Sequence, residues 1–506
     1  MRDKKFYKNL MFSLISFGVS IIQSVWFVPF IMKNMGAEPY GYIAVVMNFI
    51  NVSTIISVAI TSMSSRYISI ELQKRDYKEA NQYFNSIISA VIIIGVVLAI
   101  IFTIIICNIT QLMNVSYIYK SQVQVLFAIA AISLIISILN TPFLAGLYHT
   151  NRLYVMYTFI TLNYVFKIIV SIIFLNFGEI KLWNMAFGGV IIDVASIIYY
   201  LSNYRRYMPN LVISASDSKI KYIITVLKSG IWVSITKAGA VLLTTISTYI
   251  SNLFVSAMIT GIYASIMQLQ SLIAVLVVAI VSCFVPQMYK NFAENKNIEL
   301  IEYTKQSIRF LSIPLGLLSG GIIVYGKYFM ILWLGESFGN YEKLIILIMI
   351  YLPFSLTAEM LNQVNITIDK IKIPAIVTVI MGCVNIFMTY FLIKVLNMGI
   401  YGIALSQGII NGIRGFIFFP LYTSYEFKIS KKTFYPAMLS CPLVSLITIF
   451  TCLIIETLGT PNTWLKLIAN AVVVAFIVLS VVSKIVLSKD ERNSAMQLLK
   501  RKKSKC

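Results

Sequence analysis

Five charged residues lie inside apolar stretches that are each long enough to cross a membrane: Lys167, Asp193, Lys237, Glu359 and Arg414. Inserting a charge at such depth costs at least about 2.5–3.5 kcal/mol, so each of them needs a compensating role. A lysine binds phosphate as a point charge, and an arginine binds it through two parallel hydrogen bonds. Lys237, Arg414 and Lys167 are therefore candidates for holding the phosphate of an anionic cargo.

The two acids admit a second role, and both pairs admit a purely structural one. Asp193 and Glu359 are candidates for coupling to H⁺ or Na⁺, because a buried carboxylate can take up and release a cation. The structural alternative is that Lys167 with Asp193, and Glu359 with Arg414, form ion pairs that only fix helix packing. Lys237 then has no obvious acid left to pair with.

The elements that must position these charges are membrane helices. The chain has 506 residues, of which 59% are hydrophobic and 12% are charged, about half the charged content of soluble proteins. Apolar runs long enough to span a bilayer recur, and they do not alternate as β-barrel strands would. We expect an all-α polytopic membrane protein with 14 transmembrane helices. The predicted spans are 10–32, 41–63, 84–107, 123–148, 153–176, 181–203, 229–252, 259–285, 307–333, 343–366, 374–395, 399–422, 434–456 and 464–488.

The positions of the basic residues indicate the orientation. With a cytoplasmic N-terminus, 31 Lys and Arg fall on the cytoplasmic side, seven fall in the opposite loops, and three lie within helices. This bias predicts that both termini are cytoplasmic. The net charge of +22 is thus explained by membrane topology, and we expect no nucleic-acid partner. The basic end of the chain, 489–506, is expected to lie near anionic headgroups.

The second half of the chain repeats the first at a shift of about 219–220 residues. Residues 37–62 and 257–282 align without a gap, and eight of the 26 positions are identical. Repeats of this size are typical of transporters that hold their substrate between two similar halves. The expected parts are a six-helix N-lobe (1–205), a six-helix C-lobe (206–425), and two final helices with a basic tail (426–506). Because each lobe has six spans, the repeats are parallel.

Two polar segments, 66–86 and 286–307, follow the second span of each half. Their composition fits short amphipathic helices at the cytoplasmic interface, and it fits a solvated linker equally well.

Catalysis and metal binding find no support in the residues. The six cysteines are scattered without metal-ligand or disulfide spacing, and the single histidine, His149, lies at a helix end. No loop is long enough to hold a catalytic domain. We therefore expect no enzyme activity, no catalytic residue, no metal and no cofactor.

Several stretches carry a family resemblance that covers essentially the whole chain. They are GAEPYGYIAVV (36–46), SMSSRYISIELQKRDYKEANQYFNS (62–86) and NMGIYGIALSQGI (397–409), within a layout of six, six and two spans. With these features the chain resembles the multidrug/oligosaccharidyl-lipid/polysaccharide exporter superfamily, and most of all its polysaccharide-biosynthesis flippases of the Wzx type. The lipid II flippases of that superfamily rely on arginines in the first, second and eighth spans, where this chain has no charge.

The resemblance implies a function and partners. It implies a flippase that exports undecaprenyl-diphosphate-linked oligosaccharide units by alternating access, for O-antigen of lipopolysaccharide, capsule or teichoic-acid synthesis. The protein would lie in the bacterial cytoplasmic membrane, among membrane lipids, and would work beside a polysaccharide polymerase and glycosyltransferases. The alternative is a cation-coupled multidrug or small-molecule antiporter of the same superfamily.

Overall fold

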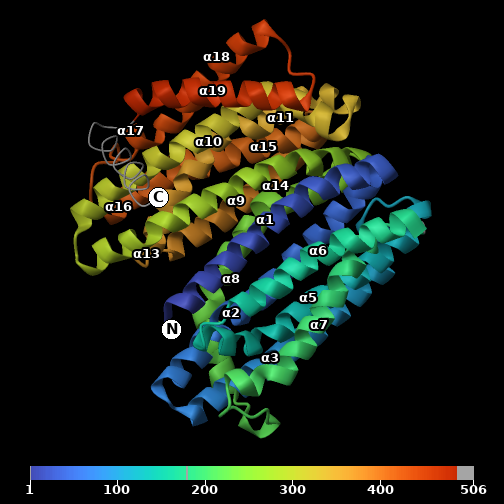
Figure 1. Cartoon of the computed structure of the whole chain (residues 1–506), viewed down its shortest axis with the longest axis vertical. Helices are drawn as coiled ribbons and strands as arrows, with labels where there is room; N and C mark the ends of the chain where they lie inside the picture. The colour runs from blue at the N-terminus through green and yellow to red at the C-terminus, as the bar shows by residue number, and fades with distance from the viewer. Residues whose placement is uncertain (1, 178–180, 487–506) are drawn as a thin grey trace. The chain divides into compact units, whose positions relative to one another are not determined.

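The chain folds almost entirely into helices (Figure 1). The computed structural model describes residues 2–177 and 181–486. Within these ranges no strand is present, and 14 helical stretches are long and apolar enough to cross a membrane. The predicted all-α fold with 14 spans is thus confirmed. Residues 489–506, the basic tail, lie outside the described residues.

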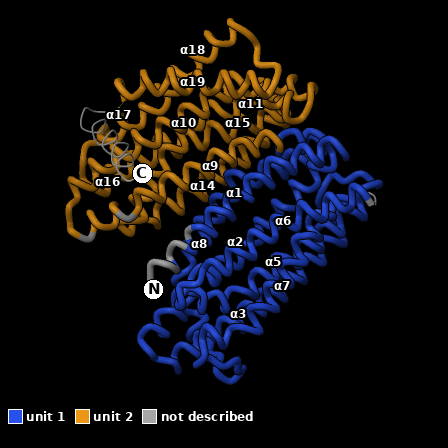
Figure 2. The backbone as a smooth tube through the Cα atoms, in the orientation of Figure 1, with its two compact units in different colours: residues 1–264 blue, residues 265–506 orange. Residues whose placement is uncertain are grey.

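Two compact units divide the chain, residues 1–264 and residues 265–506 (Figure 2). The boundary falls within one long helix, α9 (Ala257–Ala293). The lobes expected from the sequence, 1–205, 206–425 and 426–506, follow the internal repeat and stay a prediction.

The first unit contains the helices up to α8 and the beginning of α9. They are α1 (Arg2–Met35), α2 (Ala37–Lys74), α3 (Tyr77–Cys107), α4 (Ile109–Leu112), η1 (Tyr117–Tyr119), α5 (Lys120–His149), α6 (Tyr154–Phe177), α7 (Asn184–Tyr207), η2 (Ala215–Asp217) and α8 (Ile220–Phe254). Helix α2 packs against α8, α5 and α3, and α6 packs against α7 and α1.

The second unit begins within α9 and contains the remaining elements. They are α10 (Asn297–Leu334), η3 (Glu336–Tyr341), α11 (Glu342–Met349), α12 (Leu352–Ser355), η4 (Leu356–Ala358), α13 (Glu359–Thr367), α14 (Lys372–Lys394), α15 (Gly399–Gly412), the π-helical turn η5 (Ile413–Phe418), α16 (Phe419–Glu426), α17 (Tyr435–Met438), α18 (Ser440–Leu458) and α19 (Trp464–Ile485). Helix α10 packs against α18, α14 against α15, and α11 against α15.

Several spans are much longer than a bilayer requires. Helices α2 and α10 each have 38 residues, about 57 Å of helix against a hydrocarbon core of about 30 Å. The polar segments 66–86 and 286–307 therefore continue the neighbouring spans and are not separate interface helices. Each contains one tight turn, between α2 and α3 and between α9 and α10.

The internal repeat is visible in the backbone of these turns. Arg75 (φ 63°) and Asn295 (φ 56°), at equivalent positions of the repeat, are both left-handed, and so are Asn151 (φ 53°) and Asp369 (φ 58°), whose positions correspond almost as closely. Next to the first pair, the amide of Asp76 donates to Glu71 O at 3.1 Å, and the equivalent amide of the second half forms the same bond at 2.9 Å. Such bonds close the end of a helix, so the two halves end their second spans in the same way.

Two spans of the second unit are interrupted. The tenth, Glu336–Thr367, is built from η3, α11, α12, η4 and α13, and the twelfth, Gly399–Glu426, contains the π-helical turn η5 between α15 and α16. Each break lies beside a proline, Pro353 in the first turn of α12 and Pro420 in the first turn of α16. Proline lacks the amide hydrogen that would continue the helix and crowds the preceding turn. Glu359 and Arg414 lie at these two breaks.

Candidate functional site

Asp193 lies in a polar cluster between three helices of the first unit. Its carboxylate accepts hydrogen bonds from the Ser133 hydroxyl on α5 and from Asn163 Nδ2 on α6, the latter at 2.9 Å. Asn163 Nδ2 also donates to the carbonyl of Gly189 at 2.9 Å. A half-buried carboxylate needs such donors on the side that water does not reach. The cluster therefore holds the charge of Asp193 by hydrogen bonds from neutral groups.

Lys167 lies close to this cluster and is not paired with it. A Cβ atom at Gly189 would come within 2.5 Å of Lys167 Cε, so the absence of a side chain at Gly189 lets the lysine lie across α7. Among the described residues, no carboxylate oxygen comes within 4.0 Å of Lys167 Nζ. Its ammonium lies 5.8 Å from the ring centroid of Tyr164. The direct ion pair weighed as a structural role for Lys167 and Asp193 is thus not formed.

Lys237 is held by an amide on the facing helix. Its Nζ donates to Asn51 Oδ1 at 2.8 Å, and Asn51 Nδ2 donates in turn to Thr245 Oγ1 at 3.3 Å. Asn51 belongs to α2, whereas Lys237 and Thr245 belong to α8. Both lysine and asparagine are half-buried. Asn51 orients the ammonium without neutralising it.

The close packing of α2 and α8 is what brings these two side chains together. A Cβ atom at Gly230 of α8 would lie 1.9 Å from the carbonyl oxygen of Ala59 of α2. Real Cβ atoms do not approach backbone so closely, so only glycine fits at this position. The contact fixes the two helices two turns from the Lys237–Asn51 hydrogen bond.

Glu359 and Arg414 face each other across the two interrupted spans. Arg414 Nη2 lies 3.6 Å from Glu359 Oε1, longer than a good hydrogen bond. Asn362 Nδ2 donates to Glu359 Oε2 at 3.3 Å, and the guanidinium carbon lies 5.3 Å from the ring centroid of Phe419. Arg414 Nε is buried, and no described residue accepts a hydrogen bond from it. Because the contact with Glu359 is long, the terminal nitrogens of the guanidinium keep capacity to bind an anion.

The structure therefore divides the five predicted residues into three places. Asp193 and Lys167 are neighbours without a direct ion pair, Lys237 lies on a separate helix pair of the same unit, and Glu359 pairs with Arg414 in the second unit. Sequence reasoning missed the neutral partners Ser133, Asn163 and Asn51. The available signal was a polar residue in the middle of an apolar span, but serine and asparagine are common enough there that charge was the stronger criterion.

Similarity to known proteins places the chain in a family. Residues 6–292 match the family described as "Polysaccharide biosynthesis protein". The chain belongs to this family. Along 99% of both sequences it is 27% identical to a Bacillus subtilis (strain 168) relative described as "Uncharacterized membrane protein EpsK". The matched segment, residues 6–292, contains Lys167, Asp193 and Lys237.

Solved structures share the fold of this family member. A lipid II flippase, MurJ, in an inward closed conformation has a TM-score of 0.72 and 17% identity, covering 95% of this chain and 100% of the other. An inward-facing multidrug resistance transporter of the MATE family has a TM-score of 0.67 and 13% identity, covering 82% and 99%. At these identities the likeness shows a common fold.

Proposed function

We propose that the protein is a flippase for lipid-linked oligosaccharides in surface-polysaccharide synthesis. The cargo would be an undecaprenyl-diphosphate-linked repeat unit, moved across the bacterial cytoplasmic membrane by alternating access. Both chain ends would be cytoplasmic, in line with the bias of basic residues. The product would be O-antigen, capsule or teichoic-acid polymer, so the cargo would come from glycosyltransferases and pass to a polymerase.

This proposal rests on the hydrogen-bond partner of the Lys237 ammonium, which is a neutral amide. An ammonium within a membrane span is normally matched by a carboxylate, because an unpaired charge is expensive there. Lys237 instead donates to the amide oxygen of Asn51. A neutral acceptor leaves a full positive charge that an anionic cargo can satisfy. Membership of a polysaccharide-biosynthesis family makes a diphosphate-linked saccharide the best-fitting anion.

Arg414 and Lys167 support the proposal in different ways. Arg414 is only loosely balanced by Glu359, whose Oε1 lies 3.6 Å from Nη2, so the terminal nitrogens of the guanidinium can donate to a phosphate oxygen without losing a strong hydrogen bond to the acid. Lys167 has no carboxylate within 4.0 Å among the described residues. These cations would attract the headgroup at different stages of transport, while Asp193 and Glu359 would limit how tightly the anion is held.

The test is a complementation assay for surface glycan in a strain that lacks its own flippase. Lys237→Gln and Arg414→Gln keep much of the side-chain length and remove the charge, and the alanine variants at both positions remove the side chain as well. Lys228→Gln, at an exposed position on the same helix as Lys237, is the matched control. We expect strong loss of glycan display for both site variants and normal display for the control. Full display by both glutamine variants at normal protein level would refute the site.

A cation-coupled antiporter is the second candidate, and the cluster around Asp193 favours it. The carboxylate with its serine and asparagine donors could exchange those contacts for a proton or a sodium ion. This reading predicts that drug efflux is measurable and that Asp193→Asn or Glu359→Gln abolishes it. A resistance assay in a pump-deficient host decides between the two candidates, because the flippase gives no resistance.

A further inference from the structure

Helix α8 opens the second half of the internal repeat, but it is hydrogen-bonded to the first half at both of its ends. Its counterpart at a shift of 220 residues is α1, whose Lys5 and Asn9 bond to the turn between α5 and α6 of its own half. Helix α8 instead packs against α2 and α3. The two helices that begin the halves are therefore attached in different ways.

The start of α8 is bonded to α3 through two side chains. Ser86 Oγ accepts a hydrogen bond from the amide of Lys219, the residue before α8, at 2.8 Å and donates to the carbonyl of the same residue at 3.2 Å. Further along α8, the Tyr222 hydroxyl donates to Gln82 Oε1 at 2.7 Å. Ser86 is fully buried, so a separation of α8 from α3 would leave its hydroxyl without these partners.

The linker that precedes α8 is fixed on α3 as well. Its twelve residues, 208–219, could extend over about 40 Å and would then let the two halves separate freely. The side-chain amide of Asn85 instead accepts from the amide of Ser214 at 2.8 Å and donates to the carbonyl of Val212 at 2.9 Å. One turn earlier on α3, Asn81 Oδ1 accepts from the amide of Val212 at 2.9 Å. The linker thus holds the start of α8 close to α3.

The far end of α8 is bonded to the end of α4 and to the segment that follows α4. The Tyr249 hydroxyl donates to the carbonyl of Leu112 at 2.8 Å. Asn252, which is fully buried, accepts from the amide of Asn114 at 2.9 Å and donates to its carbonyl at 3.4 Å. Between the two ends, the close approach of Gly230 keeps the backbones of α8 and α2 in direct contact. Helix α8 is thus attached to first-half elements along its length.

The chain leaves the helical conformation directly after α8. Val255 has φ −113° and ψ −84°, and α9 then begins with a cap of its own, in which Ser256 Oγ accepts from the amide of Ile259 at 3.2 Å. Helix α9 is one continuous helix from Ala257 into the second unit, so its parts move together. Hinges in proteins are commonly a few residues at the ends of such elements. Val255 and Ser256 are therefore a natural joint.

We propose that α8 moves with the first half during transport, so that α1–α8 form one body and the second body begins with α9. This inference rests on alternating access, which is part of the proposed function. The sequence repeat favours a different division, at 205/206, in which α8 belongs to the second body. That division would break the bonds at both ends of α8 in every cycle. It would leave the buried groups of Asn85, Ser86 and Asn252 without partners, which is costly in a protein interior.

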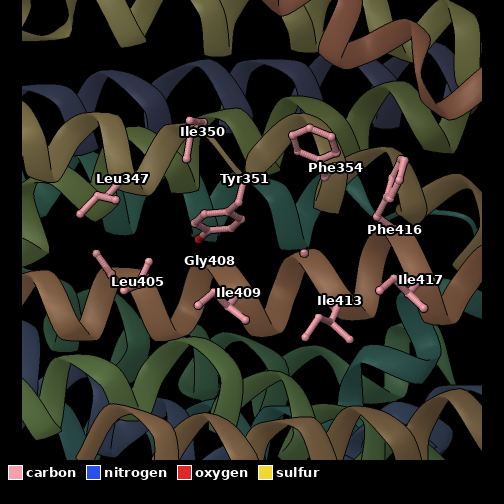
Figure 3. Close-up of a pocket in the computed structure, with 12 residues that line it drawn as sticks. Leu347, Ile350, Tyr351, Phe354, Leu405, Gly408, Ile409, Ile413, Phe416 and Ile417 are labelled. Atoms are coloured by element: carbon pink, nitrogen blue, oxygen red, sulfur yellow. The ribbon is translucent and has the colours of Figure 1, made fainter. Parts of the chain in front are cut away.

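This division keeps each charged contact within one body. The first body carries Lys237, which keeps Asn51 as its partner in every state. The second body carries Glu359 and Arg414, and in it the tenth and twelfth spans pack against each other around Tyr351 (Figure 3). Neither contact is then a gate, and transport changes the access to these cations rather than their partners.

The test bridges α8 to the first half in the full-length protein, in a background with the six native cysteines replaced. Ser86→Cys is combined with Lys219→Cys at the start of α8, and Asn114→Cys is combined with Asn252→Cys at its end. A short bis-methanethiosulfonate links each pair before glycan synthesis is induced, and newly displayed glycan is measured. We expect each bridged protein to display as much glycan as the same protein without the bridge. A loss of display on bridging that a reductant reverses would overturn the inference.

A bridge across the joint is the matched control. Ala37 at the start of α2 and Ala257 at the start of α9 lie where these helices touch, because a Cβ atom on Gly261 would lie 1.8 Å from the carbonyl oxygen of Ala37. Bridging Ala37→Cys to Ala257→Cys should abolish display until the reductant is added. Full display with this bridge would show that α9 does not move apart from α2, which contradicts the division into these two bodies.

Spin labels give a second measurement, which needs no cargo and leaves the bonded residues intact. Ile104 of α3, Leu201 of α7, Ile231 of α8 and Ile380 of α14 are exposed and can carry the labels. In nanodiscs, the Ile104–Ile231 distance distribution should be no broader than the Ile104–Leu201 distribution, which lies within the first half. The Ile231–Ile380 distribution, which crosses the joint, should be broader.

The outcomes separate this inference from the proposed function. An Ile104–Ile231 distribution broader than that of Ile104–Leu201, or equal widths for all three pairs, would overturn the inference. A narrow Ile104–Ile231 distribution and a broad Ile231–Ile380 distribution, in a protein that fails to restore glycan display, would instead count against the proposed function. The attachment of α8 to the first half would then still stand.

Discussion

Gly41 and Gly261 touch each other backbone to backbone, and they do so symmetrically. A Cβ atom built on Gly41 would lie 3.0 Å from the amide nitrogen of Gly261, and a Cβ atom on Gly261 would lie 3.0 Å from the amide nitrogen of Gly41. The same atoms would lie 2.2 Å from the carbonyl oxygen of Ala257 and 1.8 Å from that of Ala37. The two glycines occupy equivalent positions of the internal repeat, so the first turns of α2 and α9 meet about a local two-fold axis.

This contact predicts a gate at the end of the helices that the charge bias puts outside. Gly41→Ala and Gly261→Ala each force the two helix ends apart, because neither backbone oxygen can yield to a methyl group. We expect a cysteine at Ala264, one turn deeper on α9 and buried, to become reactive to an impermeant maleimide added outside. The measurement is the alkylation rate in a background with the six native cysteines replaced.

Gly18→Ala in α1 is the control for the gate, because a Cβ atom there meets nothing within 4 Å. It should leave the alkylation rate unchanged. An unchanged rate in both gate variants would show that the contact does not seal the outer end.

Asn51→Asp should separate stability from transport. The new carboxylate would pair with Lys237, whose Nζ already lies 2.8 Å from the side-chain oxygen of residue 51. A partly buried charge-assisted hydrogen bond is roughly twice as strong as a neutral one, so the thermal unfolding temperature should rise by a few degrees. Glycan display should fall strongly, because the lysine is neutralised. Asn51→Ala removes the acceptor and should lower the unfolding temperature. If Asn51→Asp displays glycan normally, the free charge of Lys237 is not what the cargo binds.

Asn163→Ala should destabilise the first unit. Asn163 Nδ2 bridges the carboxylate of Asp193 and the carbonyl of Gly189, so its removal leaves two acceptors without this donor. Orphaned buried groups cost about 1–3 kcal/mol each, and more when charged. Asn176→Ala, at an exposed position on the same helix, is the control and should change stability little. Thermal unfolding in nanodiscs measures both variants. Equal stability would mean that water reaches Asp193.

The two repeated turns offer a matched pair for the cost of a helix cap. Asp76 Oδ1 accepts from the amide of Glu79 at 3.0 Å at the start of α3, whereas its repeat counterpart Lys296 makes no side-chain cap. Asp76→Ala should therefore lower the free energy of unfolding by about 1 kcal/mol. Lys296→Ala should change it little, because its ion pairs with Glu294 and Glu299 are exposed. Equal effects in unfolding measurements would exclude the capping explanation.

The sequence predicts the helices of this fold well because a single property, apolar length, determines them. Each predicted span overlaps one of the 14 helical stretches, and 464–488 runs two residues beyond the described part of the chain. The main difference is that α2 and α10 extend far beyond the bilayer. Polar residues such as those of 66–86 fit an interface helix and the end of a long helix equally well, so composition alone does not distinguish them.

The neighbours of the buried charges were harder to predict. Which residue faces Lys237 depends on the register between α2 and α8, and this register is set by the Gly230–Ala59 contact between residues far apart in the chain. The ion pair of Glu359 with Arg414, the structural alternative for these two residues, is present at 3.6 Å. Lys167 and Asp193, in contrast, form no direct ion pair. Neutral donors from α5 and α6 make the hydrogen bonds to the acid instead.

The length of α2 has a mechanical consequence when its first turn is held at Gly41. From Gly41 to Lys74 the helix extends about 50 Å as one rigid rod. A tilt of about 10° at that pivot carries Lys74 through about 9 Å, while residues one turn from the pivot move by about 1 Å. A small rearrangement at one end of α2 would thus become a displacement several times larger at the other end, and the leverage comes from the residues that extend beyond the bilayer.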